Sequence, residues 1–437
     1  MKVMKFGGTS VGSPQRIKDV AALIGDKGRN IVVLSAMSGT TNSLIEISKA
    51  VKDGDPQLAC RLISSLEERY KGVVDELFST EEWRKTASEK TAVFFNDIRH
   101  TISSPDSPLL EKEIVSRGEL ISTNLMHAYL QEQGVASVLL PALAFMRTDE
   151  HGEPDLPYIT KHLASLIEEN ADAALFITQG FICLDHNGEI NNLERGGSDY
   201  TASLIGAAVK AEEIEIWTDI DGMHNNDPRF VEGTRPVRNL HFEEAAELAY
   251  FGAKILHPTC IQPAKLNNIP VRLLNTMQPD APGTLIDNVL RRGYIKAVAA
   301  KDNITAIKIK SGRMLLAYGF LKMVFEIFEK HETAIDMITT SEVGVSLTID
   351  NERNLDRIVE ELHRFGTVTI DRDMTIICVV GDLEWQNRGF EAKALDALRD
   401  IPVRMISYGG SNYNISFLIK AEDKNRALKA LSAEIFE

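Results

Sequence analysis

The N-terminal half of the sequence repeats one order of elements: an apolar strand, a polar or glycine-rich loop, and then a helix. Residues 2–6 form the first expected strand, which runs into residues 7–10 (Gly-Gly-Thr-Ser), and Pro14 then opens a helix. Residues 31–34 form a second expected strand, and a polar loop joins it to a helix beginning near Ser43. This order predicts an open α/β sheet with a ligand at the carboxyl ends of its strands.

Residues 55–104 interrupt this alternation with a helical insertion. Apolar residues recur there at the spacing of a helix, with charged residues between them. We interpret this apolar stripe as packing rather than as a binding groove. After a helix at 111–133, the strand and helix order resumes with a strand at 137–140 and a helix at 158–170.

A glycine pair at residues 196–197 follows the strand-like run 173–184. The pair lets the backbone approach a small ligand closely, and Ser198 or Asp199 can cap the helix that we expect at 204–211. A helix N-terminus beside a guanidinium, here that of Arg195, suits an anionic ligand. Taken by itself, this pattern is more often an ordinary tight turn, so further signals are needed.

Two other loops at strand ends supply those signals. The glycine pair at residues 7–8, beside Lys5, offers backbone donors and a fixed cation for the oxygens of a transferred phosphate. Thr218-Asp219 follows the next strand, and Arg229 and Lys254 farther along could frame a nucleotide with it. Each signal is weak singly, because a glycine pair is often a turn and a lysine is usually solvated. Their common place at strand ends favours one shared phosphate site.

From about residue 300 the pattern changes to short strands and helices. Strands are expected at 304–309, 344–349, 374–380, 402–407 and 413–419, and helices at 319–331, 355–365, 390–396 and 423–435. Two βαββαβ-like units in tandem account for this order, and such pairs commonly bind small molecules where they meet.

Composition and charge exclude several classes of protein. A chain of 437 residues can hold two or three domains, and its net charge of -15, with no strongly basic segment, argues against nucleic-acid binding. The 4 cysteines are scattered without a CxxC spacing, which favours reduced thiols in the cytoplasm over disulfides or a zinc site. We expect no signal peptide and no membrane span, because no apolar run is long enough.

The four longest motifs together resemble aspartate kinase, of the amino-acid kinase family. They are residues 5–11 (Lys-Phe-Gly-Gly-Thr-Ser-Val), 195–199 (Arg-Gly-Gly-Ser-Asp), 217–222 (Trp-Thr-Asp-Ile-Asp-Gly) and 251–258 (Phe-Gly-Ala-Lys-Ile-Leu-His-Pro). The resemblance runs through the whole chain, including the insertion. It implies an open α/β sheet of amino-acid kinase type with helices on both faces over 1–290, and over 300–437 a regulatory region of two α+β, ferredoxin-like ACT units.

The resemblance implies ATP-dependent phosphorylation of the β-carboxylate of L-aspartate to 4-phospho-L-aspartate, the first step of lysine, threonine and methionine biosynthesis. A carboxylate with a pKa of about 4 is already ionised at neutral pH, so this reaction needs no general base. It needs alignment of two anions and neutralisation of the phosphoryl oxygens. Mg²⁺ is expected with ATP, held mostly by ATP oxygens and water, without a protein ligand motif.

The family pattern divides the candidate residues among three groups. The catalytic group is Lys5, Gly7, Gly8, Asp199 and Lys254. The aspartate group is Thr41, Glu119, Phe181, Arg195 and Ser198. The nucleotide group is Lys5, Gly7, Gly8, Ser10, Thr218, Asp219, His224, Arg229, Lys254 and Ile255.

The resemblance implies an individual role for several of these residues. The resemblance places Arg195 on the α-carboxylate, where a planar fork can bind in two places, and Glu119 on the α-ammonium. The competing interpretation of Glu119 is a first-turn acid that complements the helix dipole. Asp199 would orient lysine rather than act as a base. His224 departs from the family, since relatives often carry tyrosine at that position.

The C-terminal part resembles the effector site of lysine-inhibited aspartate kinases. The residues concerned are Met314, Gly319, Phe320, Leu321, Asp336, Thr340, Ser341, Glu342 and Val343. Amides at the start of the helix after Gly319 can receive the α-carboxylate of an effector. The alternative is that Asp336 and Ser341 only cap local turns. Leu316 and Ala317 stand where some lysine-sensitive relatives carry polar residues. We expect L-lysine to inhibit through an interface between ACT units of two subunits, in a homodimer or homotetramer.

Two other functions stay open at this point. The first is another carboxylate kinase of the same fold, such as an acetylglutamate kinase. The helical insertion and the pairing of Arg195 with Glu119 for a free amino acid argue against it. The second is a non-catalytic amino-acid sensor that keeps the ACT pair, and the intact kinase motifs argue against that.

Overall fold

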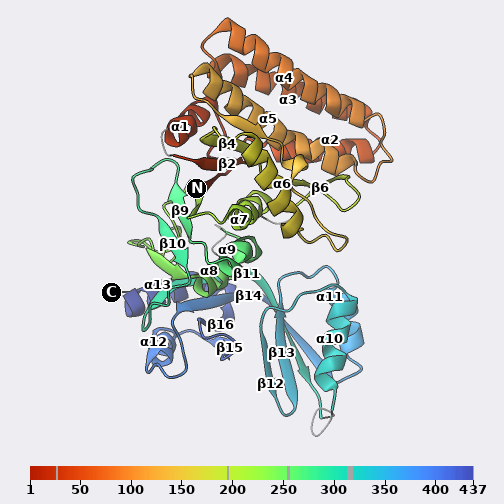
Figure 1. Cartoon of the computed structure of the whole chain (residues 1–437). Coiled ribbons are helices and arrows are strands. Elements are labelled where there is room, and N and C mark those ends of the chain that lie inside the picture. The colour runs from red at the N-terminus through yellow and green to blue at the C-terminus, as the bar shows by residue number, and fades with distance from the viewer. Residues whose placement is uncertain (26–27, 194–195, 253–255, 313–317, 437) are drawn as a thin grey trace. The chain divides into compact units, whose positions relative to one another are not determined.

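The computed structural model describes residues 1–25, 28–193, 196–252, 256–312 and 318–436 (Figure 1). The chain forms two compact units: Met1–Met223 with Leu256–Asn288, and His224–Ile255 with Val289–Glu437. The segment 224–255, which the sequence motifs group with the first part of the chain, therefore clusters with the C-terminal part.

An open, mostly parallel sheet lies at the centre of the first unit. Its strands are β1 (Lys2–Phe6), β2 (Asn30–Leu34), β3 (Val138–Leu140), β4 (Leu175–Gln179), β7 (Ile214–Thr218), β9 (Val271–Asn275) and β10 (Thr284–Asp287). They follow the order β3-β4-β2-β1-β7-β9-β10, and β10 pairs antiparallel with β9. Every residue of β2 and β4 is buried, which explains their continuous apolar sequence in a sheet covered on both faces. The expected open α/β sheet is confirmed.

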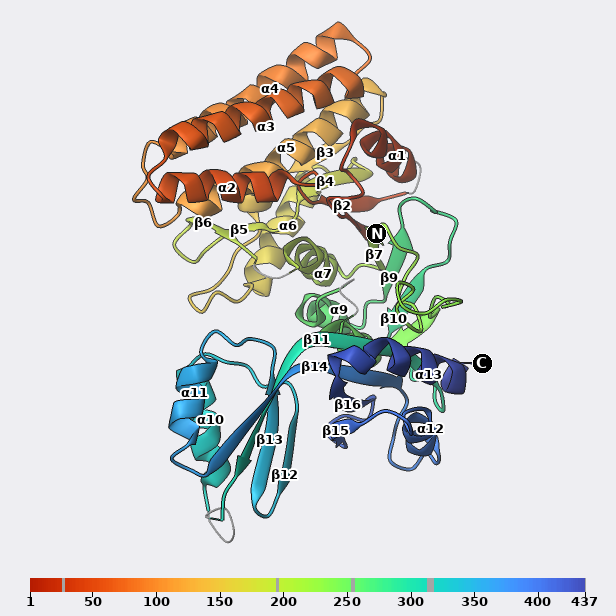
Figure 2. The ribbon, with the colours of Figure 1, turned by 180° about the vertical axis from the view of Figure 1, so that it is seen from behind.

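Helices cover both faces of this sheet (Figures 1 and 2). One face carries α1 (Pro14–Ile24), α2 (Thr40–Lys52), α3 (Pro56–Leu77), α4 (Glu81–Thr101) and α5 (Leu110–Glu132); the other carries α6 (Leu156–Glu169), α7 (Gly197–Val209) and α9 (Gln262–Leu266). The insertion is the pair α3 and α4, and its apolar stripe packs inward as expected. Tyr70 and Phe95 are buried there with ring centroids 5.9 Å apart.

The strand-like run 173–184 is interrupted rather than continuous. After β4, Phe181 adopts a positive φ of 68°, and a short strand β5 (Ile182–Leu184) turns away to pair with β6 (Ile190–Asn192). The positive φ breaks the extended backbone at the point where the parallel sheet ends. The end of β4 therefore presents a sharp corner instead of a longer strand.

Two helices begin earlier than the sequence predicts. The helix α7 begins at Gly197 instead of 204, with Gly196 at its N-cap in the left-handed region (φ 68°), so the expectation that Ser198 or Asp199 caps it is wrong. Both residues lie in its first turn instead. The helix α2 begins at Thr40 instead of Ser43, after Gly39, which is also left-handed (φ 80°). In both cases a glycine closes the turn, because it adopts a positive φ at little cost.

The second unit contains an antiparallel sheet in the order β12-β13-β11-β14-β16-β15. Its strands are β11 (Ile295–Lys310), β12 (Ile338–Ser341), β13 (Gly344–Ile349), β14 (Thr367–Gly381), β15 (Val403–Tyr408) and β16 (Asn414–Lys420); its helices are α8 (Phe242–Tyr250), α10 (Phe320–Lys330), α11 (Leu355–Leu362), α12 (Phe390–Ala397) and α13 (Lys424–Phe436). The short strand β8 (Asn239–His241) precedes α8, and β12 was not expected from the sequence.

Two ACT-like units are present as expected, but they are nested and not in tandem. Residues 295–301 of β11 pair with 376–381 of β14, whereas 304–310 pair with 367–374. The second ACT-like unit therefore takes its first strand from a segment that precedes the first unit. Each has its own hydrophobic core, one around Phe320 and Val345 and the other around Phe417 and Leu428. The two long strands, β11 and β14, run through both ACT-like units and join them.

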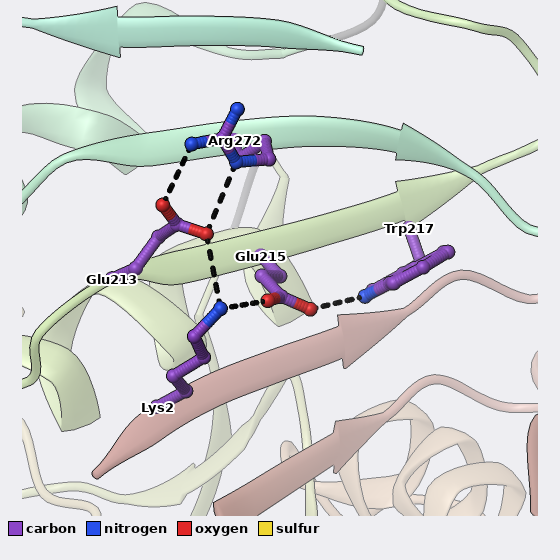
Figure 3. Close-up of polar contacts among 5 residues, drawn as sticks. All are labelled: Lys2, Glu213, Glu215, Trp217 and Arg272. Carbon is purple, nitrogen blue, oxygen red and sulfur yellow. Dashed lines mark hydrogen bonds and ion pairs between the residues drawn. The ribbon is translucent and has the colours of Figure 1, made fainter. Parts of the chain in front are cut away.

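A row of charged side chains crosses β1, β7 and β9 on one face of the first sheet (Figure 3). Lys2 Nζ lies 2.7 Å from Glu215 Oε1 and 3.4 Å from Glu213 Oε1. Arg272 donates two hydrogen bonds to Glu213, at 3.1 and 3.0 Å. The other oxygen of Glu215 accepts a hydrogen bond from Trp217 Nε1 at 2.9 Å. Glu215 is only 6% exposed, and both of its oxygens are paired, as the burial of a carboxylate requires.

The row predicts a measurable difference between two substitutions of Glu215. Glu215→Ala removes the acceptor of the Trp217 indole, and we expect it to lower the unfolding free energy by about 2 kcal/mol. Glu215→Gln keeps an oxygen for Trp217 and loses only the charge facing Lys2, whose side chain is 42% exposed, so its cost should stay below about 1 kcal/mol. Thermal unfolding followed by near-ultraviolet circular dichroism measures both. Equal losses would show that the hydrogen bond to Trp217 contributes little.

Candidate active site

Lys5 and Asp199 form an ion pair at the carboxyl edge of the parallel sheet. Lys5 is the penultimate residue of β1, and Asp199 lies in the first turn of α7; Nζ and Oδ1 are 2.7 Å apart. Their side chains are only 12% and 13% exposed, so the pair is held in a largely dehydrated setting. A partly buried cation with a fixed partner keeps its position, which suits a group that must meet anionic oxygens.

The glycines around this pair are required by close packing. A Cβ at Gly196 would lie 2.5 Å from Cys260 Sγ, and one at Gly197 would lie 2.4 Å from the Phe181 ring. A Cβ at Gly8 would lie 2.8 Å from the carbonyl oxygen of Ala36, in the loop after β2. Gly8, Gly196 and Gly197 thus let the loops at the strand ends pack closely against one another.

Glu119 is a buried carboxylate in the middle of α5. It is 3% exposed, and its Oε1 accepts a hydrogen bond from the Ala36 amide at 3.2 Å. Its Oε2 has no hydrogen-bond partner among the described residues. Burial raises the pKa of Glu119 to about 8. The interpretation as a first-turn acid is therefore wrong, since Leu110 begins the helix and the first-turn acids are Glu111 and Glu113.

The loops after β2 and β4 bring further candidate residues to the same edge. Ser198 Oγ accepts a hydrogen bond from Ser35 Oγ at 3.0 Å, and Ser122 Oγ donates to the Ser35 carbonyl at 2.8 Å. The Phe181 amide donates to Thr201 Oγ1 at 3.0 Å. Glu119 lies in the same helix as Ser122, which is linked to Ser198 through Ser35, so Glu119 and Ser198 belong to one connected set. Arg195 lies outside the described residues. Ser35 was not among the residues expected from the sequence, although it stands directly after the buried strand β2.

Thr41 lies one residue into α2, half-buried, and no described contact ties it to this set. The loop after β1 contains Ser10, which is fully buried and bonds through its hydroxyl to Thr276 Oγ1 at 2.7 Å. Ser10 was expected near the nucleotide, and here its side chain faces the protein interior.

The expected nucleotide residues are spread over both compact units. Thr218 Oγ1 donates to Asp219 Oδ1 at 3.1 Å, directly after β7 in the first unit. His224, in the second unit, shares a hydrogen bond with Thr234 Oγ1 at 3.0 Å, and Arg229 pairs with Asp227 at 2.6 Å. Lys254 and Ile255 lie outside the described residues. The adjacent residues Thr218 and Asp219 are hydrogen-bonded to each other. The contacts given above for His224 and Arg229 are with residues of their own unit, the second.

Asp336, expected in an effector site, is held by two neighbours in the second unit. Its Oδ1 lies 2.6 Å from Lys301 Nζ and accepts a hydrogen bond from Tyr250 Oη at 2.8 Å. The Asp336 side chain is 2% exposed, and burial raises its pKa even though Lys301 opposes this shift. Lys301 also pairs with Asp350 at 3.0 Å. The alternative role of Asp336, capping a local turn, does not match these contacts.

The other expected effector residues surround the start of α10 and the turn after β12. Gly319 is the left-handed N-cap of α10, and Phe320 is buried in the adjoining core with Leu321 packed against it. Thr340, Ser341, Glu342 and Val343 are exposed, and Ser341 Oγ donates across the turn to the Gly344 carbonyl at 3.4 Å. Met314, Leu316 and Ala317 lie outside the described residues.

The described residues also bear on metal binding, membrane spanning and thiol chemistry. Within the described ranges, no group of three or more His, Cys, Asp or Glu side chains could hold a metal ion. None of the helices in the described part of the chain is both long enough and apolar enough to cross a membrane. The described residues Cys60, Cys183, Cys260 and Cys378 form no disulfide with one another.

Comparison with known proteins places this geometry in a family. Residues 1–275 match the model of the amino acid kinase family, and residues 377–435 match an ACT domain model. The chain is 32% identical to lysine-sensitive aspartokinase 3 of Escherichia coli (strain K12), covering 100% of this chain and 99% of that protein. It is 36% identical to the chloroplastic aspartokinase 3 of Arabidopsis thaliana, covering 100% of this chain and 81% of the relative.

Two solved structures of Escherichia coli aspartokinase III are similar over the full length of both chains. The complex with aspartate and ADP, in the R-state, has a TM-score of 0.85 to this chain at 32% identity. The complex with lysine and aspartate, in the T-state, has a TM-score of 0.84 at the same 32% identity.

The burial of Glu119 predicts a pH-dependent stability difference. The pKa of Glu119 is about 8 in the folded protein, above the ordinary 4.5. Between these two pH values Glu119 is protonated in the folded protein and ionised in the unfolded chain. Stability from this group is therefore fully present below about pH 4.5 and falls as pH rises toward 8. Glu119→Gln mimics the protonated form and should gain about 4 kcal/mol over the natural protein between pH 5 and pH 8.5.

The control for this prediction is Glu111→Gln, on the exposed face of the same helix. Melting temperatures of the three proteins at several pH values make the comparison. The difference between the natural protein and Glu119→Gln should change with pH, and that for Glu111→Gln should not. A constant difference for both would mean that Glu119 is ionised in the folded protein throughout this range.

Proposed function

This chain belongs to the aspartokinase family within the amino acid kinases, and on that premise we propose that Lys5, Asp199 and the loop of Gly7 and Gly8 carry its phosphoryl transfer. The protein is an aspartate kinase, which phosphorylates the β-carboxylate of L-aspartate with ATP to give 4-phospho-L-aspartate. The observation that supports the proposed residues best is the ion pair of Lys5 with Asp199, at 2.7 Å beside both glycine pairs.

The proposed catalysis is electrostatic. The β-carboxylate of aspartate is already ionised at neutral pH, so no residue must remove a proton from it. The Lys5 ammonium neutralises charge on the transferred phosphoryl, and the amide of Gly8 donates to its oxygens, whereas the Gly7 amide already donates to the Trp217 carbonyl at 3.3 Å. Asp199 holds the ammonium of Lys5 in place, which avoids reorganisation during the transfer. Lys254 completes the set by the family pattern.

The proposed aspartate pocket is built around Glu119, with Arg195, Ser198, Thr41 and the Phe181 backbone. The Glu119 Oε2 atom would bind the substrate ammonium, because Glu119 Oε1 already accepts a hydrogen bond from the Ala36 amide. Because the pKa of Glu119 is raised, its carboxyl group is protonated near neutral pH when aspartate is not bound. An arriving ammonium favours the ionised carboxylate, so aspartate binding releases that proton. Arg195 receives the α-carboxylate in a forked contact.

The proposed nucleotide site contains the loop after β1 and the end of β7. Thr218 and Asp219 follow β7 directly, and the family pattern adds His224, Arg229, Lys254 and Ile255. Ser10 contributes by holding its loop, since its hydroxyl is bonded inside the protein. Mg²⁺ enters with ATP as part of the substrate complex, held by phosphate oxygens and water. The four free thiols support a cytoplasmic enzyme.

We propose that L-lysine inhibits this enzyme by binding at the ACT-like units, across an interface between two subunits of a homodimer or homotetramer. The related aspartokinase III has been solved with lysine and aspartate in its T-state. In this chain the Asp336 carboxylate already holds the ammonium of Lys301. An effector ammonium must therefore share or replace this contact, and lysine must bind the low-activity state more tightly.

The kinase proposal is tested by turnover with Lys5→Ala. Removing a charge contact that acts on the transition state should lower kcat about 100-fold, while the KM for aspartate changes little. The assay is acyl phosphate trapped with hydroxylamine, with ATP and aspartate as substrates. Lys2→Ala, on the same strand but outside the proposed site, is the control and should keep its turnover. Near-normal turnover of Lys5→Ala would remove Lys5 from the mechanism.

The regulatory proposal is tested by Asp336→Asn. We expect the lysine concentration for half-inhibition to rise at least about 10-fold, since a charged hydrogen bond to a buried carboxylate is lost. Asp350→Asn is the matched control, because it also faces Lys301 but leaves Asp336 intact. Activity is titrated with lysine, threonine and methionine. Undiminished lysine inhibition in Asp336→Asn, or inhibition by threonine alone, would contradict the proposed effector site.

A further inference from the structure

Thr276 joins the two loops to which the proposed phosphate and nucleotide roles were assigned. It follows the last residue of β9, is 5% exposed, and was not singled out by its sequence context. Its amide donates to the Thr218 carbonyl at 2.8 Å, and its hydroxyl donates to the same carbonyl at 3.0 Å. Its Oγ1 is also 2.7 Å from Ser10 Oγ. One side chain thus contacts the loop after β1 and the end of β7.

The proton of each hydroxyl can be assigned by counting. A threonine hydroxyl has one proton, and that of Thr276 points to the Thr218 carbonyl. The proton between Ser10 and Thr276 must then come from Ser10, which donates to Thr276 Oγ1. The other acceptor near Ser10 is the Trp217 carbonyl at 3.4 Å, beyond the usual range for a hydroxyl donor. Thr276 is therefore the better acceptor for the Ser10 hydroxyl.

The Ser10 contact reaches the glycine pair through the backbone. The Ser10 amide donates to the Gly7 carbonyl at 2.9 Å, so Ser10 and Gly7 move together. The direct bond from the Gly7 amide to the Trp217 carbonyl is long, at 3.3 Å. Among these contacts between the glycine loop and the ends of β7 and β9, the bond from Ser10 to Thr276 is the shortest. It is suited to fix how far the loop lies from Thr218 and Asp219.

We propose that Thr276 is a positioning residue for phosphoryl transfer. Its hydroxyl accepts from Ser10 and donates to Thr218, and so sets the spacing between the glycine loop and the nucleotide end of β7. The inference rests on the roles proposed above for these two loops. Phosphoryl transfer depends on alignment of the reacting groups, so a small change in this spacing lowers turnover before it unfolds the protein.

Two substitutions of Thr276 separate its hydroxyl from its volume. Thr276→Val keeps the shape and removes the hydroxyl, and we expect kcat to fall about 10-fold with the KM for aspartate within about twofold, since both buried hydrogen bonds of this hydroxyl are lost. Thr276→Ser restores the hydroxyl and should keep kcat within about threefold of the natural enzyme. Thr91→Val, which removes a buried hydroxyl from α4, is the control and should keep its turnover.

The pair of hydroxyls should also act as one unit. Ser10→Ala should reproduce the kcat loss of Thr276→Val, and the double variant should be no slower than the slower single variant. Melting temperatures identify any loss caused by unfolding. If Thr276→Val does not fold, Ser10→Ala still decides, because it leaves the hydroxyl of Thr276 on Thr218.

Several outcomes would overturn the inference. Normal turnover in Thr276→Val or in Ser10→Ala would show that the hydroxyl contact does not align the loops. Equal losses in Thr276→Ser and Thr276→Val would assign the effect to side-chain volume. In each case a natural enzyme that still forms acyl phosphate leaves the kinase proposal standing, whereas its failure to do so under the same conditions would reject the kinase proposal itself.

Discussion

The ion pair of Lys5 with Asp199 depends on almost every feature of the first compact unit. Lys5 reaches the carboxyl edge because β1 lies in the interior of a parallel sheet, between β2 and β7. Asp199 faces it because Gly196 takes a left-handed conformation and lets α7 begin at Gly197. A side chain at either glycine would collide with Cys260 or Phe181. The pair therefore requires the sheet order, the glycine turn and the packing around them at once.

Two buried carboxylates of this unit show how burial can serve either stability or binding. Glu215 has both oxygens paired, with Lys2 on one side and Trp217 on the other, and it fits a structural role. Glu119 has one oxygen on the Ala36 amide and the other without a partner among the described residues. An incompletely paired buried carboxylate costs stability, and its retention is accounted for if a cationic ligand completes it.

The nested ACT-like units of the second compact unit share two long strands, because β11 and β14 run from one ACT-like unit into the other. Asp336 of the first ACT-like unit contacts Tyr250 at the end of α8. That helix leads directly toward Lys254 in the sequence. Asp336, proposed for the effector site, therefore contacts the helix that precedes the proposed phosphate-binding residue Lys254 in the sequence.

The sequence by itself determined the α/β class, the helical insertion, the ACT-like units and most of the candidate residues. These features are encoded locally, in apolar periodicity, glycine pairs and motifs of several residues. It misplaced the starts of α2 and α7, because a left-handed glycine can begin a helix without a polar cap. It assigned the ACT-like units a tandem order, since strand pairing joins segments far apart in the chain. It also missed β12, a short strand that pairs with its neighbour β13 across a tight turn. Only the tertiary structure placed Thr276 against Ser10 and buried Glu119, because both contacts depend on which strands are neighbours.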